Sequence, residues 1–175
     1  MNCYFLMNVQ VFCCEIEVMD VFLGMIKNIF DESVTNDVIG RIGTLTADSK
    51  ALWGSMSVGQ MLAHCSVTYE MIFEDKHARP PAAIRLMLKW FVKPTVVGVK
   101  PYKKNSQTAP AFKMTEEKDF EISKNKLIEY LQKVQNLGPS YFEGRESHSF
   151  GKLTIAEWNA MFYKHLDYHL SQFGV

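Results

Sequence analysis

Apolar residues recur three and four positions apart along most of the chain, which is the spacing of a helix that buries one face. The pattern is clear in five segments, at residues 34–45, 58–75, 82–93, 119–138 and 155–173. The one stretch that reads as a strand is "PTVVGV", residues 94–99. Several amphipathic helices with almost no strand predict an all-α helical bundle.

Residues that favour the ends of helices support these boundaries. Ser, Thr and Asn cap helix starts, proline suits a first turn, and glycine follows a last turn. The expected starts are Thr35 or Asn36, Ser57, Pro80 with Pro81, and a capping box of Thr154 with Glu157. Gly138 and Gly174 are the expected stops of the last two helices.

A long connector, residues 94–113, separates the third helix from the fourth and contains three prolines. A connector of this length within a compact domain tends to be functional or mobile. It belongs to a basic stretch, because residues 76–115 hold nine Lys or Arg and no Asp or Glu. Arg85, Lys89 and Lys93 form a cationic row four residues apart. Such a row serves as a solvated face, as a contact with an anionic membrane, or as a guide for an anionic substrate.

Composition and charge exclude some classes of protein. At 175 residues the chain has the length of one domain. Nineteen basic and nineteen acidic residues cancel, so nucleic acid is not an expected partner. No segment reads as a membrane span. The four cysteines form no metal or disulfide pattern, which favours free thiols and a cytoplasmic protein.

The first residues are apolar but lack the basic start and cleavage site of a signal peptide. We expect residues 1–19 to form a poorly ordered extension and residues 20–175 to form the helical domain.

Three histidines carry the main chemical hypothesis. His165 and His169 lie four residues apart on the last predicted helix, so their side chains share a face about 5–6 Å apart. Both lie within or beside its apolar stripe, where each buried imidazole needs a polar partner. His64, on the inner half of the second predicted helix, is the natural third ligand of a shared cation. From spacing alone, a metal site and a pair of packing histidines remain equal alternatives, because H-x-x-x-H is common on helices.

Several other residues lie near this triad in the predicted helices and loops. Gln60 and Gln172 lie one turn from a histidine, and Tyr168 flanks the pair, so these three are candidates to hydrogen-bond a ligand or a substrate. We expect Asp167 to be a solvated carboxylate, since it lies about 200° around the helix from His165. Cys65 is expected to pack in the core. His148 is expected to anchor a loop, and His77 to be exposed.

The segments "LWGSMSVGQMLAHC", "KNSQTAPAF" and "HSFGKLTIAEWNAMFYKHLDYHLSQFGV" resemble the DinB/YfiT-like superfamily of proposed metalloenzymes. They are most similar to a branch of uncharacterised small bacterial proteins, a domain of unknown function whose last helix reads roughly K-H-L-D-H-H-L-R-Q-F-G. The resemblance covers about residues 34–175. It implies a DinB-like four-helix bundle with an extra connecting helix and a long loop, often dimeric, in which His64, His165 and His169 bind zinc, nickel or a similar divalent ion. Tyr168 stands where the branch often has a further histidine, and Ser171 where it often has a basic residue.

The resemblance also suggests a function. Characterised relatives in the superfamily include thiol-dependent S-transferases and a mycothiol-dependent maleylpyruvate isomerase. An open metal position would activate a low-molecular-weight thiol or a water, for an S-transferase-like or hydrolase-like reaction on an unknown small-molecule substrate. Two alternatives remain, namely a non-enzymatic metal-binding or stress-associated bundle that dimerises, and a member that binds no metal. No catalytic side chain can be assigned.

Overall fold

The computed structural model describes residues 26–175, and helices dominate this part of the chain. The predicted extension of residues 1–19 and the predicted start of the domain at residue 20 lie outside it. The four longest helices are α2 (Glu32–Thr44), α3 (Val58–Phe73), α6 (Phe120–Leu137) and α8 (Ile155–Gln172). The shorter elements are α4 (Ala82–Met87), the π-helix η1 (Leu88–Val92), α5 (Lys93–Val97), the 3₁₀ turn η2 (Pro110–Phe112), α7 (Pro139–Phe142), and strands β1 (Glu146–Ser147) and β2 (Gly151–Lys152).

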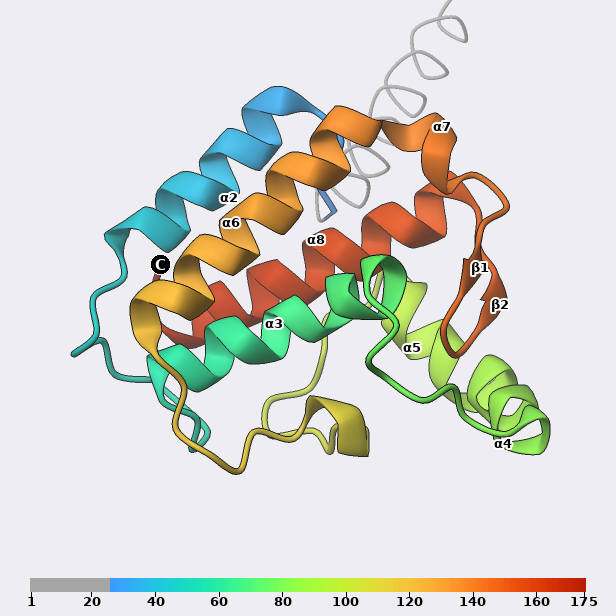
Figure 1. The fold of residues 1–175 in the computed structure, drawn as a ribbon, viewed down its shortest axis with the longest axis horizontal. Coiled ribbons are helices and arrows are strands. Elements are labelled where there is room, and N and C mark those ends of the chain that lie inside the picture. The colour runs from blue at the N-terminus through green and yellow to red at the C-terminus, as the bar shows by residue number, and fades with distance from the viewer. Residues whose placement is uncertain (1–25) are drawn as a thin grey trace, which may run out of the picture.

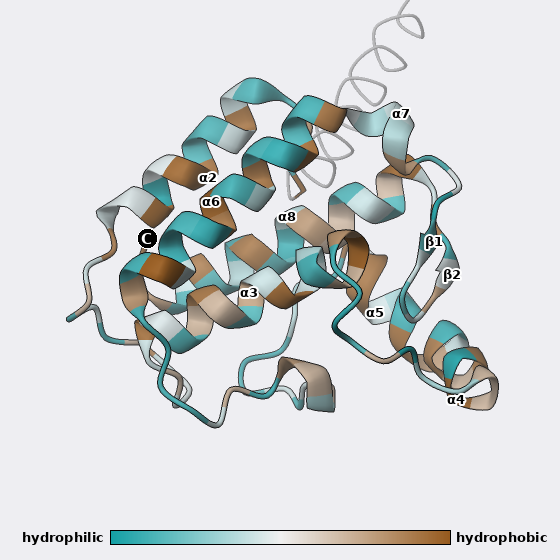
Figure 2. Ribbon diagram, viewed as in Figure 1, coloured by the Kyte–Doolittle hydropathy of each residue, from teal (hydrophilic) through white to brown (hydrophobic). Residues whose placement is uncertain are grey.

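The four long helices pack around one hydrophobic core (Figure 1). Helix α3 contacts α6 and α8, and α2 contacts the same two helices. Apolar bands alternate with polar ones along each helix, as the predicted spacing requires (Figure 2). The structure therefore confirms a largely α-helical fold.

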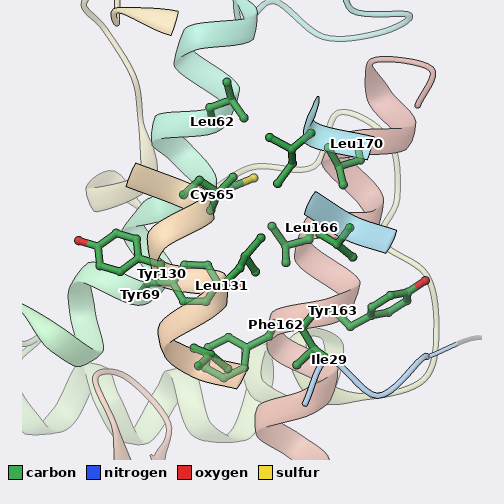
Figure 3. Packing of buried hydrophobic residues seen from close by; sticks show 14 of the residues in the cluster. Ile29, Leu62, Cys65, Tyr69, Tyr130, Leu131, Phe162, Tyr163, Leu166 and Leu170 are labelled. Atoms are coloured by element: carbon green, nitrogen blue, oxygen red, sulfur yellow. The ribbon is translucent and has the colours of Figure 1, made fainter. Parts of the chain in front are cut away.

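Aromatic side chains fill much of the centre (Figure 3). The ring of Tyr69 on α3 lies between two other rings, 5.6 Å from that of Tyr130 on α6 and 5.2 Å from that of Phe162 on α8. All three are buried, and Trp158 stacks beside Phe162. Because these rings come from three different helices, they fix α3, α6 and α8 relative to one another.

The two helices that carry the histidines begin where the sequence predicted. The Ser57 hydroxyl accepts a hydrogen bond from the backbone N–H of Gln60, and the Gln60 side chain accepts one from the Ser57 N–H. The same reciprocal box joins Thr154 and Glu157 at the start of α8. These capping boxes satisfy backbone donors that the first turn leaves free, so they set the register of both helices.

The first described helix begins earlier than predicted, at Glu32, with Asp31 in the cap position. Thr35 was an expected cap, but it is buried inside the helix and its hydroxyl donates to the Ile29 carbonyl at 2.6 Å. The Thr35 hydroxyl therefore links the helix to the loop that precedes it. The helix begins about one turn earlier than the sequence predicted.

The candidate strand at residues 94–99 is not formed, because α5 continues the third helix as far as Val97. Proline in a helix lacks the N–H for the regular ladder and clashes with the carbonyl four residues earlier. The π-helical turn just before Pro94 widens the spiral at that point, which lets the chain remain helical. The strands of the described chain instead form a short antiparallel hairpin, in which Glu146 faces Lys152.

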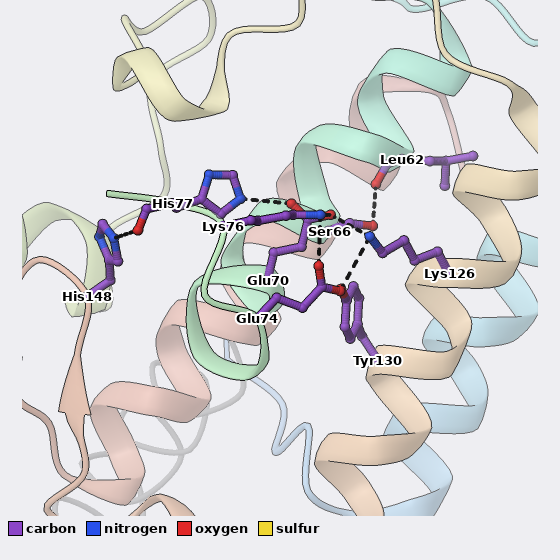
Figure 4. A network of polar contacts seen from close by, with 9 residues as sticks. All are labelled: Leu62, Ser66, Glu70, Glu74, Lys76, His77, Lys126, Tyr130 and His148. Atoms are coloured by element: carbon purple, nitrogen blue, oxygen red, sulfur yellow. Dashed lines mark hydrogen bonds and ion pairs between the residues drawn. The ribbon is translucent and has the colours of Figure 1, made fainter. Parts of the chain in front are cut away.

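A polar network joins the end of α3 to α6 (Figure 4). The buried Glu70 carboxylate accepts from Lys126 at 2.8 Å and from the His77 ring at 2.9 Å. His77 is thus only partly exposed, contrary to the prediction, because its ring has a buried acidic partner. The His77 carbonyl lies 3.1 Å from Nε2 of His148, which anchors the loop before α8 as expected.

None of the helices between residues 26 and 175 combines the length and the apolarity needed to cross a bilayer.

Candidate metal centre

Helices α3 and α8 lie side by side and bring the three predicted histidines together (Figure 1). His64 lies in the middle of α3, and His165 and His169 lie one turn apart near the end of α8. His64 and His169 are buried, while His165 is partly exposed. The convergence that the spacing predicted is therefore present.

The three imidazoles meet at their tips. One nitrogen from each ring lies within 4.8 Å of the other two, and no further His, Cys, Asp or Glu of residues 26–175 joins the group. The Nε2 atoms of His64 and His165 are 3.1 Å apart. The ring centroids of His64 and His169 are 4.5 Å apart, and those of His165 and His169 are 4.9 Å apart. Such a cluster has the dimensions of a single-ion site.

The opposite ring nitrogen of each histidine has its own hydrogen-bond partner. Nδ1 of His64 lies 2.8 Å from the backbone oxygen of Phe112. Nδ1 of His169 lies 2.8 Å from Oε1 of Gln172, and Nδ1 of His165 lies 3.1 Å from Oγ1 of Thr68. A carbonyl oxygen can only accept, so Nδ1 of His64 donates and its Nε2 carries a lone pair. Outer hydrogen bonds of this kind orient histidine ligands around metals.

The orientation of Gln172 is itself fixed. Its Nε2 donates to the Trp53 carbonyl at 2.6 Å, which leaves Oε1 to accept from His169. The lone pair of His169 is therefore carried by Nε2, as in His64. Gln172 was a predicted candidate for this role, and the structure places it in contact with His169.

Burial keeps the three rings neutral. The pKa of His169 is lowered to about 4, chiefly by desolvation and also by the nearby His64 ring, while the Gln172 hydrogen bond opposes the shift. Desolvation also lowers the pKa of His64, although the bond to Phe112 opposes it. The pKa of His165 lies well below its ordinary value because of desolvation and its two imidazole neighbours. At neutral pH the cluster thus offers uncharged nitrogen lone pairs.

The long connector reaches the histidine cluster. The sequence alone left open whether it would do so. The Phe112 ring lies edge-on to His64 and His165, with centroids 5.3 and 5.8 Å away. The Lys103 carbonyl accepts from the Tyr168 hydroxyl at 3.2 Å, and the Lys104 ammonium lies 4.0 Å from the centre of the Trp53 ring. The connector therefore covers one side of the histidines.

The other two candidates near the histidines have different partners. Gln60 is engaged in the capping box, and its Nε2 donates to the Glu116 carbonyl at 3.2 Å. Tyr168 packs its ring against His169, at 5.0 Å between centroids, while its hydroxyl points to the connector. Tyr168 therefore lines the cluster, and Gln60 holds the start of α3.

The structure places Cys65 in the core as expected, whereas Asp167 is paired rather than simply solvated. Asp167 is about half exposed and pairs with Arg41 on α2 at 2.8 Å. Cys65 is buried in the core, and burial raises the pKa of its thiol, so the reactive thiolate is disfavoured.

Sequence reasoning missed Thr68 and Phe112. Thr68 lies four residues after His64, one turn along the same face of α3, so helical spacing contained a signal for it. Phe112 contributes a backbone carbonyl, which any residue supplies. Its position depends on the path of the connector, so no side-chain pattern could have revealed it.

No curated protein and no solved structure matches the chain. Residues 30–174 match the family described as "Protein of unknown function (DUF1569)". Because that match spans most of the sequence, including all three clustered histidines, the protein belongs to this family.

Proposed function

We propose that His64, His165 and His169 bind one divalent metal ion, zinc or nickel, at the centre of a metal-dependent enzyme of the DinB-like superfamily. The observation that supports this most strongly is the arrangement of the ring nitrogens. Each Nδ1 has a partner outside the cluster, which leaves the Nε2 atoms free to share a ligand at its centre.

The donor set fits such an ion. Neutral imidazoles are common ligands of zinc and nickel, and low pKa values leave them unprotonated at neutral pH. Two nitrogens bound at about 2.0–2.1 Å with tetrahedral angles are about 3.3 Å apart. The Nε2 atoms of His64 and His165 are 3.1 Å apart, so a shift of a few tenths of an ångström is sufficient.

Three protein ligands and no neighbouring carboxylate support a catalytic ion rather than a structural one, because structural zinc sites usually have four protein ligands. A divalent ion held by neutral imidazoles supplies Lewis acidity and lowers the pKa of a coordinated water or thiol. Thr68, Gln172 and the Phe112 carbonyl hold the rings in position, and the connector limits access of bulk water. We infer a hydrolase-like or S-transferase-like reaction on a small molecule, with a low-molecular-weight thiol as the cosubstrate in the second case.

The resemblance to the DinB-like superfamily supports the same proposal. In that superfamily one histidine on the second helix and two near the C-terminus bind the metal, and His64, His165 and His169 match those positions. We further propose that α2, α3, α6 and α8 form a DinB-like four-helix bundle. A homodimer and a cytoplasmic location remain predictions.

Cobalt substitution tests the open position. The metal-free protein loaded with Co²⁺ should show visible absorption bands, and these bands should shift when azide or a small thiol is added. The same titration on an H148N variant, which alters a histidine outside the cluster, should give the same shift. A cobalt spectrum that does not change when azide or the thiol is added, or a loss of helicity when the metal is chelated, would overturn the proposal of an enzyme. Either result would favour a non-enzymatic metal-binding bundle.

A further inference from the structure

The helical segment formed by α4, η1 and α5, residues 82–97, has its apolar side turned outward. None of its residues is buried. We refer to residues 82–92 as the arm, and Figure 1 shows α4 projecting from the rest of the described chain beside the β-hairpin. Six large apolar side chains on the arm are exposed, Ile84, Leu86, Met87, Trp90, Phe91 and Val92, with Trp90 at 68% and Phe91 at 78%. A surface helix normally buries these residue types.

The charged side of the arm faces the protein instead. Arg85 pairs with Glu146 on β1, and Lys93, just after the arm, pairs with Glu157 on α8 at 2.7 Å. The next turn is held by the buried Lys164, whose ammonium donates to the carbonyls of Thr95 and Gly98. Two of the three residues of the predicted cationic row therefore form ion pairs with the rest of the protein. These ion pairs hold the helix with its apolar residues pointing away from the protein.

An exposed apolar surface of this kind usually marks an interaction site. Trp90 and Phe91 are adjacent, while Leu86 and Trp90, and Met87 and Phe91, lie four residues apart, so the side chains form a continuous patch along the arm. Lys89 lies on the same helix face as Arg85, beside the patch rather than within it; it is exposed and has no ion-pair partner among residues 26–175.

Charge distinguishes between the occupants of this surface. No Asp or Glu occurs between residues 76 and 115, and on the arm itself the exposed Lys89 carries no ion pair within the described chain. A second copy docked through the same patch would bring like charges together, whereas an anionic bilayer supplies the missing negative charge. Aromatic and aliphatic side chains combined with lysine are the composition of helices that lie in a membrane interface.

We propose that the arm docks the protein onto the surface of an anionic lipid bilayer, with Trp90 and Phe91 inserted among the lipids and Lys89 at the headgroups. Residues 82–92 at 1.5 Å per residue extend about 16 Å, so the arm is suited to lie in the interface rather than to cross the membrane. This surface is separate from the histidine cluster, so the proposal does not depend on the metal.

Vesicle flotation with the full-length protein tests the proposal. Vesicles of phosphatidylcholine with about one third phosphatidylglycerol should carry the protein upward, and vesicles of phosphatidylcholine alone should carry much less. Raising the salt to about 1 M shortens the Debye length to about 3 Å and should weaken the binding. The double variant W90S/F91S should bind about tenfold or more weakly. The matched control is I122S, which removes an equally exposed apolar side chain (69%) on α6 and should bind like the wild type.

Tryptophan fluorescence reports on the inserted residue. Binding to the anionic vesicles should shift the emission to shorter wavelength, and the shift should be lost in W90F although that variant still floats. Failure of the wild type to float with anionic vesicles would overturn the proposal, as would equal flotation of W90S/F91S. Sedimentation that shows a dimer abolished by W90S/F91S, without vesicle binding, would assign the arm to a second copy and would equally overturn it.

Discussion

The Nε2 atoms of His64 and His165 lie 3.1 Å apart between α3 and α8. In the metal-free protein this contact requires the Nε2 of His165 to donate, because His64 holds its proton on Nδ1 for the Phe112 carbonyl. The Thr68 hydroxyl would then donate to Nδ1 of His165. The hydrogen-bonding capacity of His169 is not fully satisfied in this way. Its Nδ1 donates to Gln172, but its Nε2 lone pair has no donor among the described residues. A shared cation satisfies all three rings at once.

The Thr68 hydroxyl should therefore matter for metal affinity. A T68V variant keeps the size of this buried side chain but removes the partner of His165. Loss of such an outer hydrogen bond typically weakens metal binding about 10–100-fold. Competition with a chromophoric chelator measures the change. The control S66A removes a neighbouring buried hydroxyl that donates to the Leu62 carbonyl, and it should leave the affinity unchanged. Equal affinities of T68V and wild type would show that Thr68 does not orient the ligand.

Acid should destabilise the metal-free protein. The pKa of His169 is lowered to about 4 in the folded state, so between the ordinary value near 6.5 and pH 4 the unfolded chain binds a proton that the folded chain does not. The free energy of unfolding then falls as the pH falls through this window, by about 3 kcal/mol for His169 alone. Below pH 4 this residue adds no further loss.

Urea unfolding of the metal-free protein at pH 7, 6 and 5 measures this effect. From pH 7 to 5 most carboxylates stay ionised in both states, because their ordinary pKa values are about 4. Glu74, whose pKa the Tyr130 hydrogen bond helps to lower to about 2 in the folded protein, loses its contribution only below about pH 5. The variant H169N should make the pH dependence shallower, and the remaining slope is the contribution of His64 and His165, whose pKa values are also lowered. A stability that is constant from pH 7 to 5 in the wild type would contradict the neutral, buried cluster.

Two glycines should respond to alanine in opposite directions. A Cβ at Gly59 on α3 would lie 2.2 Å from the backbone oxygen of Lys118, just before the start of α6. We expect G59A to lower the free energy of unfolding by about 1–3 kcal/mol, because the backbone at Lys118 must move. A Cβ at Gly40, inside α2, meets nothing within 4 Å, so G40A should raise that free energy by about 0.5–1 kcal/mol. Urea denaturation distinguishes the two, and a stable G59A would contradict the close approach.

Helical periodicity and capping chemistry are local, and they predicted the helices that carry the site. Ser57 and Thr154 begin α3 and α8 as expected, and four-residue spacing placed His165 and His169 on one face. The prediction that this pair meets His64 needed one further assumption, namely that α3 and α8 are neighbours.

Features that depend on tertiary structure could not be predicted in this way. The carbonyl of Phe112 reaches His64 only because the connector folds back over α3. An amphipathic pattern normally indicates that the apolar face of a helix is buried, but on the arm the apolar face is exposed. One cause is the ion pair between Arg85 and Glu146, which lies far away in the sequence on the hairpin. Residues 94–97 are rich in β-branched side chains, yet a π-helical turn carries the helix through Pro94.

The most direct test of the central claim is the metal content of the full-length protein, purified without a histidine tag or chelator and measured by mass spectrometry. The metal centre predicts one divalent ion per chain, and its loss in each of H64N, H165N and H169N while circular dichroism shows retained helicity. The variant H148N, outside the cluster, should keep the ion. A folded wild-type protein that contains no metal and takes up no zinc, nickel or cobalt in equilibrium dialysis at pH 7 would contradict the account.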